Sequence, residues 1–156
     1  MSLELTSSVM SNGGEFPKDY TCNGRNVSLP LEISGVPIGA QSLVLIFDDP
    51  DAAKEPAGFG RTYDHWILYN IPPIDQKIPE NTIPEGAKFA INSSGGTNYV
   101  GPCPPTLRHR YSFRLYALGS VLEINNPTKE QIVQAMQGQI IEQTELYSYY
   151  EQTEDQ

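Results

Sequence analysis

Basic residues and long hydrophobic runs are both scarce in this chain. Its 156 residues include 10 Lys and Arg against 19 Asp and Glu, and the formal net charge is −9 at pH 7. Proteins that bind nucleic acid or an anionic membrane surface need a basic face, so neither is expected as a partner. The longest apolar run, Leu43–Phe47, is far shorter than the roughly 20 residues that span a bilayer. We therefore expect no integral membrane association.

Cysteine is almost absent, and no secretion signal is visible. Residues 1–5 contain neither the basic region nor the apolar stretch of a signal peptide, which leads us to expect a cytoplasmic protein. Thiols are kept reduced in that compartment. The only two cysteines, Cys22 and Cys103, are therefore expected to be free thiols rather than a disulfide.

The motifs of common catalytic and metal sites are also missing. The chain has no His-Glu-x-x-His spacing, which would hold a metal, and no serine in a nucleophile elbow. These absences favour a protein that uses no metal, no cofactor and no enzymatic mechanism.

Chain breakers and aromatic residues are abundant instead. There are 13 Gly and 13 Pro, together with nine Tyr, five Phe and one Trp. So many breakers disfavour a long helical bundle, and the aromatic residues indicate a packed interior. We predict a mainly β fold in a single domain over residues 1–156, of which about 151–156 form a frayed tail.

Hydrophobic patterning places the elements. Leu43–Phe47 is apolar at every position, which is typical of a central strand covered on both faces. Thr128 and Gln131 form a capping-box pattern before a helix over Lys129–Gln137. Residues 139–150 alternate poorly, but their Ile, Thr and Tyr content favours a strand. Further strands are expected at Leu3–Ser7, Leu31–Ile33, His65–Ile71 and His109–Leu118, and mostly irregular chain at 48–60 and 72–106.

The first group of chemically active residues follows Leu43–Phe47 directly, as Asp48-Asp49-Pro50-Asp51. In an extended chain Asp49 continues the face of Leu43, Leu45 and Phe47. A carboxylate on a buried face needs a partner, so Asp49 is a candidate site residue. A simple turn is the alternative, because Asp and Pro are ordinary turn residues.

The only two histidines each begin a predicted strand. Strand alternation places His65 on the face of Ile67 and Tyr69, with Trp66 and Leu68 on the other face. It also places His109 on the face of Tyr111 and Phe113, behind the proline-rich loop 101–105. For His65 the alternative is a structural histidine whose ring binds a backbone carbonyl, and for the loop it is a plain strand connector.

If these strands are neighbours, two imidazoles and two carboxylates meet at one end of a sheet. Imidazole and loop N–H groups would then donate to phosphate oxygens, and Asp49 would fix the tautomer of a histidine. Tyr111 would add a hydroxyl donor. Such a cluster suits a small zwitterion or a phosphomonoester.

These residues together resemble a known family, the phosphatidylethanolamine-binding proteins, and within it the short bacterial and archaeal branch described as Raf kinase inhibitor-like. The resemblance covers nearly the whole chain. It is carried by Tyr20-Thr21-Cys22-Asn23-Gly24, Asn26, Ser28, Asp49-Pro50-Asp51-Ala52, His65-Trp66, Asn70, Tyr99, Gly101-Pro102-Cys103-Pro104-Pro105, His109-Arg110-Tyr111, Phe113, Leu115-Tyr116-Ala117-Leu118, Gly138-Gln139 and Leu146.

The resemblance implies a large central sheet packed on a smaller one, a few short helices, and a shallow anion pocket at one end. It implies as ligands phosphate, phosphomonoesters, acetate-like anions and phospholipid head groups. Carried over by position, the ligand-binding residues are Asp49, Asp51, His65, Gly101, Cys103, His109 and Tyr111.

The chain also departs from the family pattern. Ala53 stands where the pattern has Pro, Leu29-Pro30 where it has two prolines, and Thr106-Leu107-Arg108 where it places Gly before the second histidine. Bulkier residues before His109 would narrow the rim of the pocket, and Arg108 would add a cation beside it. The long C-terminal helix of eukaryotic members is absent from the pattern.

We therefore expect a non-catalytic protein that binds a small anionic ligand. One alternative is an acid–base hydrolase that uses Asp49 and His109, or Cys103 as a nucleophile. Another is a kinase-inhibitor-like regulator that docks a protein partner through acidic residues of its C-terminal third, among them Glu142, Glu145, Glu151 and Glu154. A homodimer is the assembly we consider.

Overall fold

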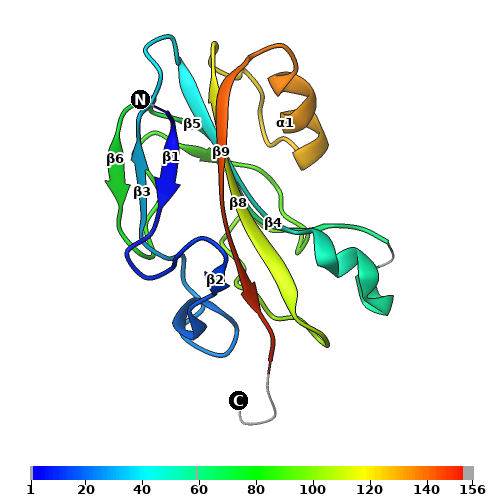
Figure 1. Cartoon of the computed structure of the whole chain (residues 1–156). Coiled ribbons are helices and arrows are strands. Elements are labelled where there is room, and N and C mark those ends of the chain that lie inside the picture. The colour runs from blue at the N-terminus through cyan, green and yellow to red at the C-terminus, as the bar shows by residue number, and fades with distance from the viewer. Residues whose placement is uncertain (1, 59, 153–156) are drawn as a thin grey trace.

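Two β-sheets of unequal size form the framework of the protein (Figure 1). The computed structural model describes residues 2–58 and 60–152, so residues 153–156 of the predicted tail lie outside the described part. The larger sheet has six strands in the order β2 (Gly14–Glu15), β9 (Ile140–Tyr150), β8 (His109–Leu118), β4 (Ser42–Asp49), β5 (Tyr63–Ile71) and β7 (Lys88–Phe89). The smaller sheet has three, in the order β1 (Glu4–Thr6), β3 (Leu31–Ser34) and β6 (Gln76–Ile78).

Short helices complete the fold. The α-helix α1 spans Lys129–Met136, and Thr128 caps it with the predicted capping box, in which Thr128 and Gln131 exchange side-chain-to-backbone hydrogen bonds. Three 3-10 helices are η1 (Lys18–Tyr20), η2 (Pro50–Lys54) and η3 (Pro56–Gly58). In the described part of the chain, no helix has the length and apolar character needed to cross a bilayer. The mainly β prediction is confirmed.

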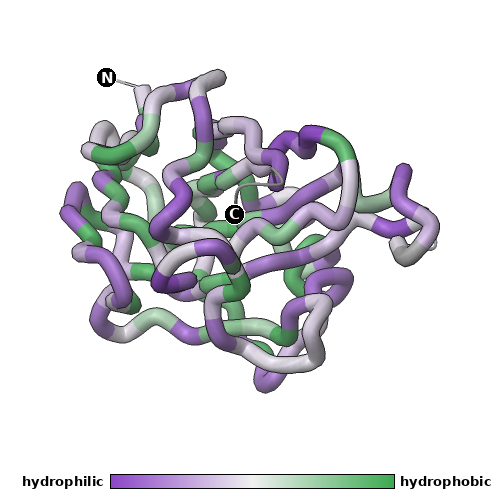
Figure 2. Tube along the Cα trace, turned by 90° about the horizontal axis from the view of Figure 1, so that it is seen from below, coloured by the Kyte–Doolittle hydropathy of each residue, from purple (hydrophilic) through white to green (hydrophobic). Residues whose placement is uncertain are grey.

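The segment Leu43–Phe47 of the central strand β4 is apolar at every position because both faces of the strand are covered. Leu43, Leu45 and Phe47 belong to a core that also contains Leu5 and Ile33 of the small sheet. Val44 and Ile46 belong to a second core, on the opposite face, with Ile132 and Met136 of α1. All eight residues of β4 are buried. Figure 2 shows how hydrophobic and hydrophilic segments alternate along the Cα trace.

Strand β4 is antiparallel to both of its neighbours, β5 and β8. The end of β4 at Asp49 therefore lies beside the beginnings of β5 and β8, near Tyr63 and His109. β8 has the bounds predicted from the sequence. β9 confirms the favoured strand, and its poor alternation has a physical cause: its first residues, such as Ile140 and Ile141, are exposed beyond the reach of the core.

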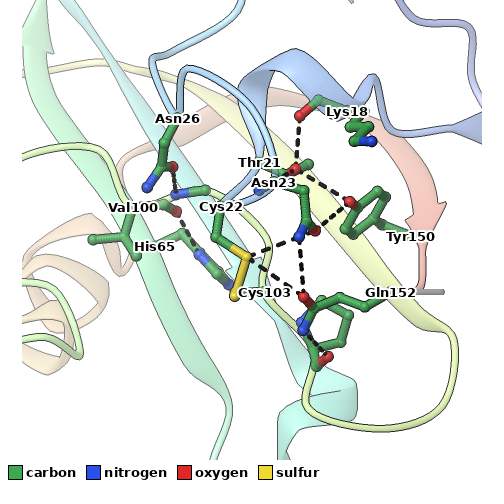
Figure 3. Close-up of a disulfide and its surroundings, with 12 residues drawn as sticks. Lys18, Thr21, Cys22, Asn23, Asn26, His65, Val100, Cys103, Tyr150 and Gln152 are labelled. Carbon is green, nitrogen blue, oxygen red and sulfur yellow. Dashed lines mark hydrogen bonds between the residues drawn. A yellow bond between two sulfur atoms is a disulfide. The ribbon is translucent and has the colours of Figure 1, made fainter. Parts of the chain in front are cut away.

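The prediction of free thiols is wrong, because Cys22 and Cys103 form a disulfide (Figure 3). The two residues are 81 positions apart in sequence, but their Cα atoms are 5.5 Å apart. The Cys22 N–H donates to the carbonyl oxygen of Pro102 at 3.1 Å, and the Gly101 N–H donates to the Asn26 Oδ1 atom at 2.8 Å. The prediction rested on the expected compartment alone. The disulfide forms because the loops that carry the two cysteines lie side by side in the fold.

We expect the disulfide to stabilise the fold by restricting the unfolded chain. The variant Cys22→Ser/Cys103→Ser should have a free energy of unfolding about 2–4 kcal/mol lower than that of the oxidised protein, because the bond closes a long loop. Urea unfolding with and without a reductant measures this. The double variant should not respond to the reductant, and equal stability of the oxidised and reduced wild-type protein would contradict the prediction.

Candidate functional site

A cavity of about 270 Å³ lies at the end of the large sheet where β4 ends and β8 begins. Its walls come from these strands, from the start of β5, from the segment of η2 and η3, and from the loop before β8. The lining residues are Asp49, Ala52, Glu55, Gly58, Tyr63, His65, Val100, Gly101, Cys103, Pro104, Pro105, His109 and Tyr111.

His65 reaches this cavity through an irregularity in β5. Phe47 pairs with Trp66, but the next residue of β4, Asp48, pairs with Asp64, so His65 is an extra residue in the ladder. Such a β-bulge reverses the alternation of side chains that follow it. The His65 ring consequently lies 5.0 Å from the Phe47 ring and 5.5 Å from that of Tyr111.

The prediction that His65 shares the face of Ile67 and Tyr69 is therefore wrong. Ile67 and Tyr69 pack in the core beneath α1, while His65 lies on the side of Phe47 and Tyr111. Regular alternation would have separated the two histidines onto opposite faces of the sheet. The bulge brings both into one cavity.

The protonation of His65 is set by burial and by one backbone contact. Its Nδ1 lies 2.6 Å from the carbonyl oxygen of Val100, so Nδ1–H is the donor (Figure 3). Burial disfavours the charged ring and lowers the pKa of His65 to about 4. The ring is then neutral at pH 7, and its second nitrogen, Nε2, is a hydrogen-bond acceptor. The carbonyl contact is the one proposed for a structural histidine, yet the ring also lines the cavity.

His109 lies between two carboxylates. Its Nδ1 is 2.6 Å from the Asp49 Oδ2 atom, and its Nε2 is 2.8 Å from the Glu55 Oε1 atom. Only the imidazolium form can donate from both nitrogens. Burial works against that charge, but hydrogen bonds and charges of Asp49 and Glu55 outweigh it and raise the pKa of His109. His109 is therefore a buried cation held by two acids.

Asp49 performs both roles considered from the sequence. It caps η2, since its Oδ1 atom accepts a hydrogen bond from the Ala52 N–H at 3.2 Å. Its other oxygen holds His109, as expected for a residue on the buried face of Phe47. Burial raises the pKa of Asp49, with His109 acting in the opposite direction. The turn and the site contact are thus two functions of one side chain.

Glu55 is the charged lining residue that sequence reasoning missed, and Tyr63 is a further lining residue outside the predicted set. Glu55 lies between η2 and η3, with its side chain buried, and its two oxygens accept hydrogen bonds from the Thr106 hydroxyl at 2.8 and 2.7 Å. The hydrogen bond from Thr106, followed by that from His109, lowers the pKa of Glu55. The sequence held no signal for Glu55, because residues 48–60 show no periodicity and an exposed threonine such as Thr106 can bind water instead.

Asp51 does not line the cavity. It accepts a hydrogen bond from the Arg110 N–H at 2.8 Å and pairs with Lys54 at 3.1 Å. Burial opposes its charge, but the Arg110 N–H and Lys54 prevail and lower its pKa. Asp51 thereby fixes η2 to the first residues of β8. Arg108, expected as a cation beside the rim, pairs with Glu15 instead.

The loop before β8 is a wall rather than a set of donors. Three of its residues are prolines, which have no N–H, and the Gly101 N–H is used by Asn26. A Cβ at Gly101 would lie 2.3 Å from the Asn26 Oδ1 atom and 2.5 Å from the Tyr20 carbonyl oxygen, so this approach requires glycine. The expectation that these N–H groups cradle a phosphate is wrong at Gly101.

Cys103 and Tyr111 complete the comparison with the predicted residues. Both line the cavity. The sulfur of Cys103 is bound to Cys22, so it has no thiolate and the nucleophile hypothesis is wrong for this state. Tyr111 is buried, and burial followed by the nearby Asp49 charge raises the pKa of its phenol. It stays a hydroxyl at pH 7, and its hydrogen bond goes to Asp49.

Acidic residues elsewhere are largely engaged within the chain. On the opposite face of the sheet, Asp48 binds Arg114 at 2.7 Å and Lys129 at 3.3 Å. Glu145 pairs with Arg110 at 3.1 Å. Among residues 2–58 and 60–152, no group of three or more His, Cys, Asp or Glu has an arrangement suited to a metal ion.

The family model for phosphatidylethanolamine-binding protein matches residues 6–151. The chain belongs to the phosphatidylethanolamine-binding protein family. A UPF0098 protein of Methanothermobacter thermautotrophicus is 40% identical over 154 residues, which cover 95% of this chain and 98% of that protein. A UPF0098 protein of Chlamydia pneumoniae is 44% identical, over 97% of this chain and 100% of its own.

Solved structures agree with this assignment. The crystal structure of a phosphatidylethanolamine-binding protein homologue from Chlamydia trachomatis superimposes with a TM-score of 0.89 at 41% identity, and covers 97% of this chain and 99% of its own. YbcL of E. coli superimposes with a TM-score of 0.85 at 26% identity, over 98% and 100%. The chain is thus a member of the family with bacterial and archaeal relatives.

The opposite protonation of the two histidines predicts a pH dependence of stability. The pKa of His65, about 4, is below its ordinary value of 6.5, so its contribution to stability is complete above pH 6.5 and declines as the pH falls towards 4. At pH 4 the loss should be about 3 kcal/mol, because each pKa unit corresponds to about 1.4 kcal/mol.

Urea unfolding of wild type and His65→Gln between pH 7 and 4 isolates this term. His109 is common to both proteins, and its raised pKa makes its own stabilisation complete below pH 6.5, so it cancels in the comparison. The two curves should converge as the pH falls. Parallel curves would mean that His65 is not held neutral.

Proposed function

We propose that this protein binds a small oxyanion without chemical conversion, in the cavity between His65 and His109. The observation that supports this most directly is the gathering of two imidazoles and the Tyr111 hydroxyl around one cavity of about 270 Å³. Membership of a family whose members are named for binding supports a binding function in general. Beyond this general binding function, we propose the class of ligand, a small oxyanion.

The size of the cavity limits the ligand. Pockets for drug-sized molecules have about 300–1,000 Å³, and this cavity has about 270 Å³. A cavity of this size can hold phosphate, a phosphomonoester or the head group of a phospholipid, whereas acyl chains would have to stay outside it. None of the lining residues is Lys or Arg, so the cation of the cavity is the His109 imidazolium, whose two nitrogens are held by Asp49 and Glu55.

The hydrogen-bonding pattern limits the ligand further. Nε2 of neutral His65 accepts, and the Tyr111 hydroxyl, which is hydrogen-bonded to Asp49, is a donor. The imidazolium of His109 becomes a second donor only when one of its two carboxylate partners leaves its nitrogen. A complementary ligand carries an ionised oxygen and also a group that donates. Hydrogen phosphate and phosphomonoester monoanions have both, and phosphoethanolamine adds an ammonium group. Sulfate at neutral pH lacks the acidic proton and should bind less well.

A hydrolase that uses Asp49 and His109 has less support. A general base needs a free lone pair within reach of the substrate. Both nitrogens of His109 face carboxylates, and burial keeps its partner Asp49 away from solvent. His109 therefore holds a charge in place, and neither of its nitrogens has a free lone pair for a substrate.

The kinase-inhibitor-like partner and the homodimer stay predictions. Of the acidic residues considered for docking, Glu145 is paired with Arg110, and Glu142 accepts a hydrogen bond from the Leu3 N–H at 2.6 Å. These internal contacts reduce the free negative charge that a partner could use.

The proposed ligand can be tested by NMR, since the chain has only two histidines to follow. Millimolar phosphate or phosphoethanolamine should shift the signals of His65 and His109, and sulfate should do so less. Tyr111→Phe should weaken binding about tenfold, because it removes one hydroxyl donor to a charged group. Tyr116→Phe, on the opposite face of the same strand, is the matched control. Unchanged histidine signals with both phosphate ligands would reject the proposal.

The redox state of the two cysteines is a separate test of the predicted cytoplasmic location. The disulfide of the structure predicts that neither Cys22 nor Cys103 reacts with a maleimide when acid-quenched cells are neutralised without a reductant. Thiols are kept reduced in the cytoplasm, so labelling of both cysteines would support the predicted location, whereas recovery of the oxidised pair would contradict it. Purified Cys22→Ser/Cys103→Ser serves as the unlabelled control.

A further inference from the structure

The position on His109 that a ligand anion would use already holds a carboxylate. Glu55 binds Nε2 of His109 at 2.8 Å, and Nδ1 is committed to Asp49. Glu55 is only 6% exposed. It lines the same cavity as His65 and Tyr111. An external oxyanion and the Glu55 carboxylate therefore require the same N–H group.

We propose that Glu55 is a tethered competitor of the ligand, which closes the anion site until an external oxyanion displaces it. This inference rests on the proposed function. It adds a residue that sets the affinity and the selectivity of the site, and that residue belongs to the segment between η2 and η3.

The contacts of Glu55 suit an exchange of partners. Among the described residues, the hydrogen bonds to its side chain come from His109 and Thr106, so the ligand inherits two donors when Glu55 leaves. Thr106 is exposed and belongs to the loop before β8 rather than to the core. The exchange replaces one carboxylate on the imidazolium with one oxyanion, and the buried cation keeps its counter-charge throughout.

The base of this segment is fixed, which confines the movement. Asp51 holds η2 to the Arg110 N–H of β8. Gly58 packs so closely on η2 that a Cβ there would lie 1.9 Å from the Ala52 carbonyl oxygen. The Glu55 side chain can therefore leave His109 without the release of η2 from the sheet.

A tethered carboxylate also imposes selectivity. A group held beside its partner competes at an effective concentration in the millimolar range or above. A monocarboxylate such as acetate makes the same contacts as Glu55 and gains nothing over it. Phosphate carries more charge and additional oxygens for Tyr111, so it can displace Glu55 where acetate cannot.

The test measures phosphate and acetate binding to wild type, Glu55→Gln and Glu55→Ala. Glu55→Ala should bind phosphate about tenfold more tightly, because one hydrogen bond to a charged group no longer has to be broken. It should also bind acetate, which the wild type should not. Glu123→Ala, which removes an exposed glutamate far from the cavity, controls for the change in net charge.

A second measurement does not depend on the ligand. Because Glu55 raises the pKa of His109, the NMR titration midpoint of His109 should fall in Glu55→Gln, which keeps the size of the side chain. It should not move in Glu123→Ala. This readout also serves if Glu55→Ala folds poorly.

The outcomes separate the inference from the proposed function. Equal phosphate affinity of wild type and both Glu55 variants would overturn the inference and leave the proposed function standing. An unchanged His109 midpoint in Glu55→Gln would overturn it as well. A lowered midpoint with no phosphate or acetate binding by any variant would reject the proposed function, and with it the competition.

Discussion

The contact of His109 with two carboxylates connects all the parts that form the cavity. Asp49 stands at the end of β4, Glu55 between η2 and η3, and His109 at the start of β8. A buried charge is tolerated only when it is paired and hydrogen-bonded. The imidazolium therefore fixes the positions of three chain segments at once, and the cavity exists between them as a consequence.

Much of this arrangement could be predicted from the sequence. The fully apolar Leu43–Phe47 indicated a strand covered on both faces, and strand alternation placed His109 beside Tyr111. Three features could not be predicted. The bulge at His65 depends on the register between β4 and β5, which pattern alone does not give. Glu55 lies in a segment without periodicity, and the disulfide depends on two loops that meet only in the folded chain.

The two histidines show how burial and partners assign different chemistry to one residue type. His65 faces a single carbonyl oxygen and aromatic rings, and it stays neutral. His109, at a similar depth, faces two acids and carries a charge. One cavity thus presents both an acceptor and a cation, and it does so without Lys or Arg.

The span of the disulfide has a consequence for cleavage of the backbone. The bond joins Cys22 to Cys103, so β3 to β7 and the segment that carries Glu55 lie inside a covalent ring. β8, α1 and β9 lie outside it. A protease that cut the chain beside the exposed Pro56 would nick the protein without releasing either piece. The two halves would stay joined through the sulfur atoms and through the strands of the large sheet.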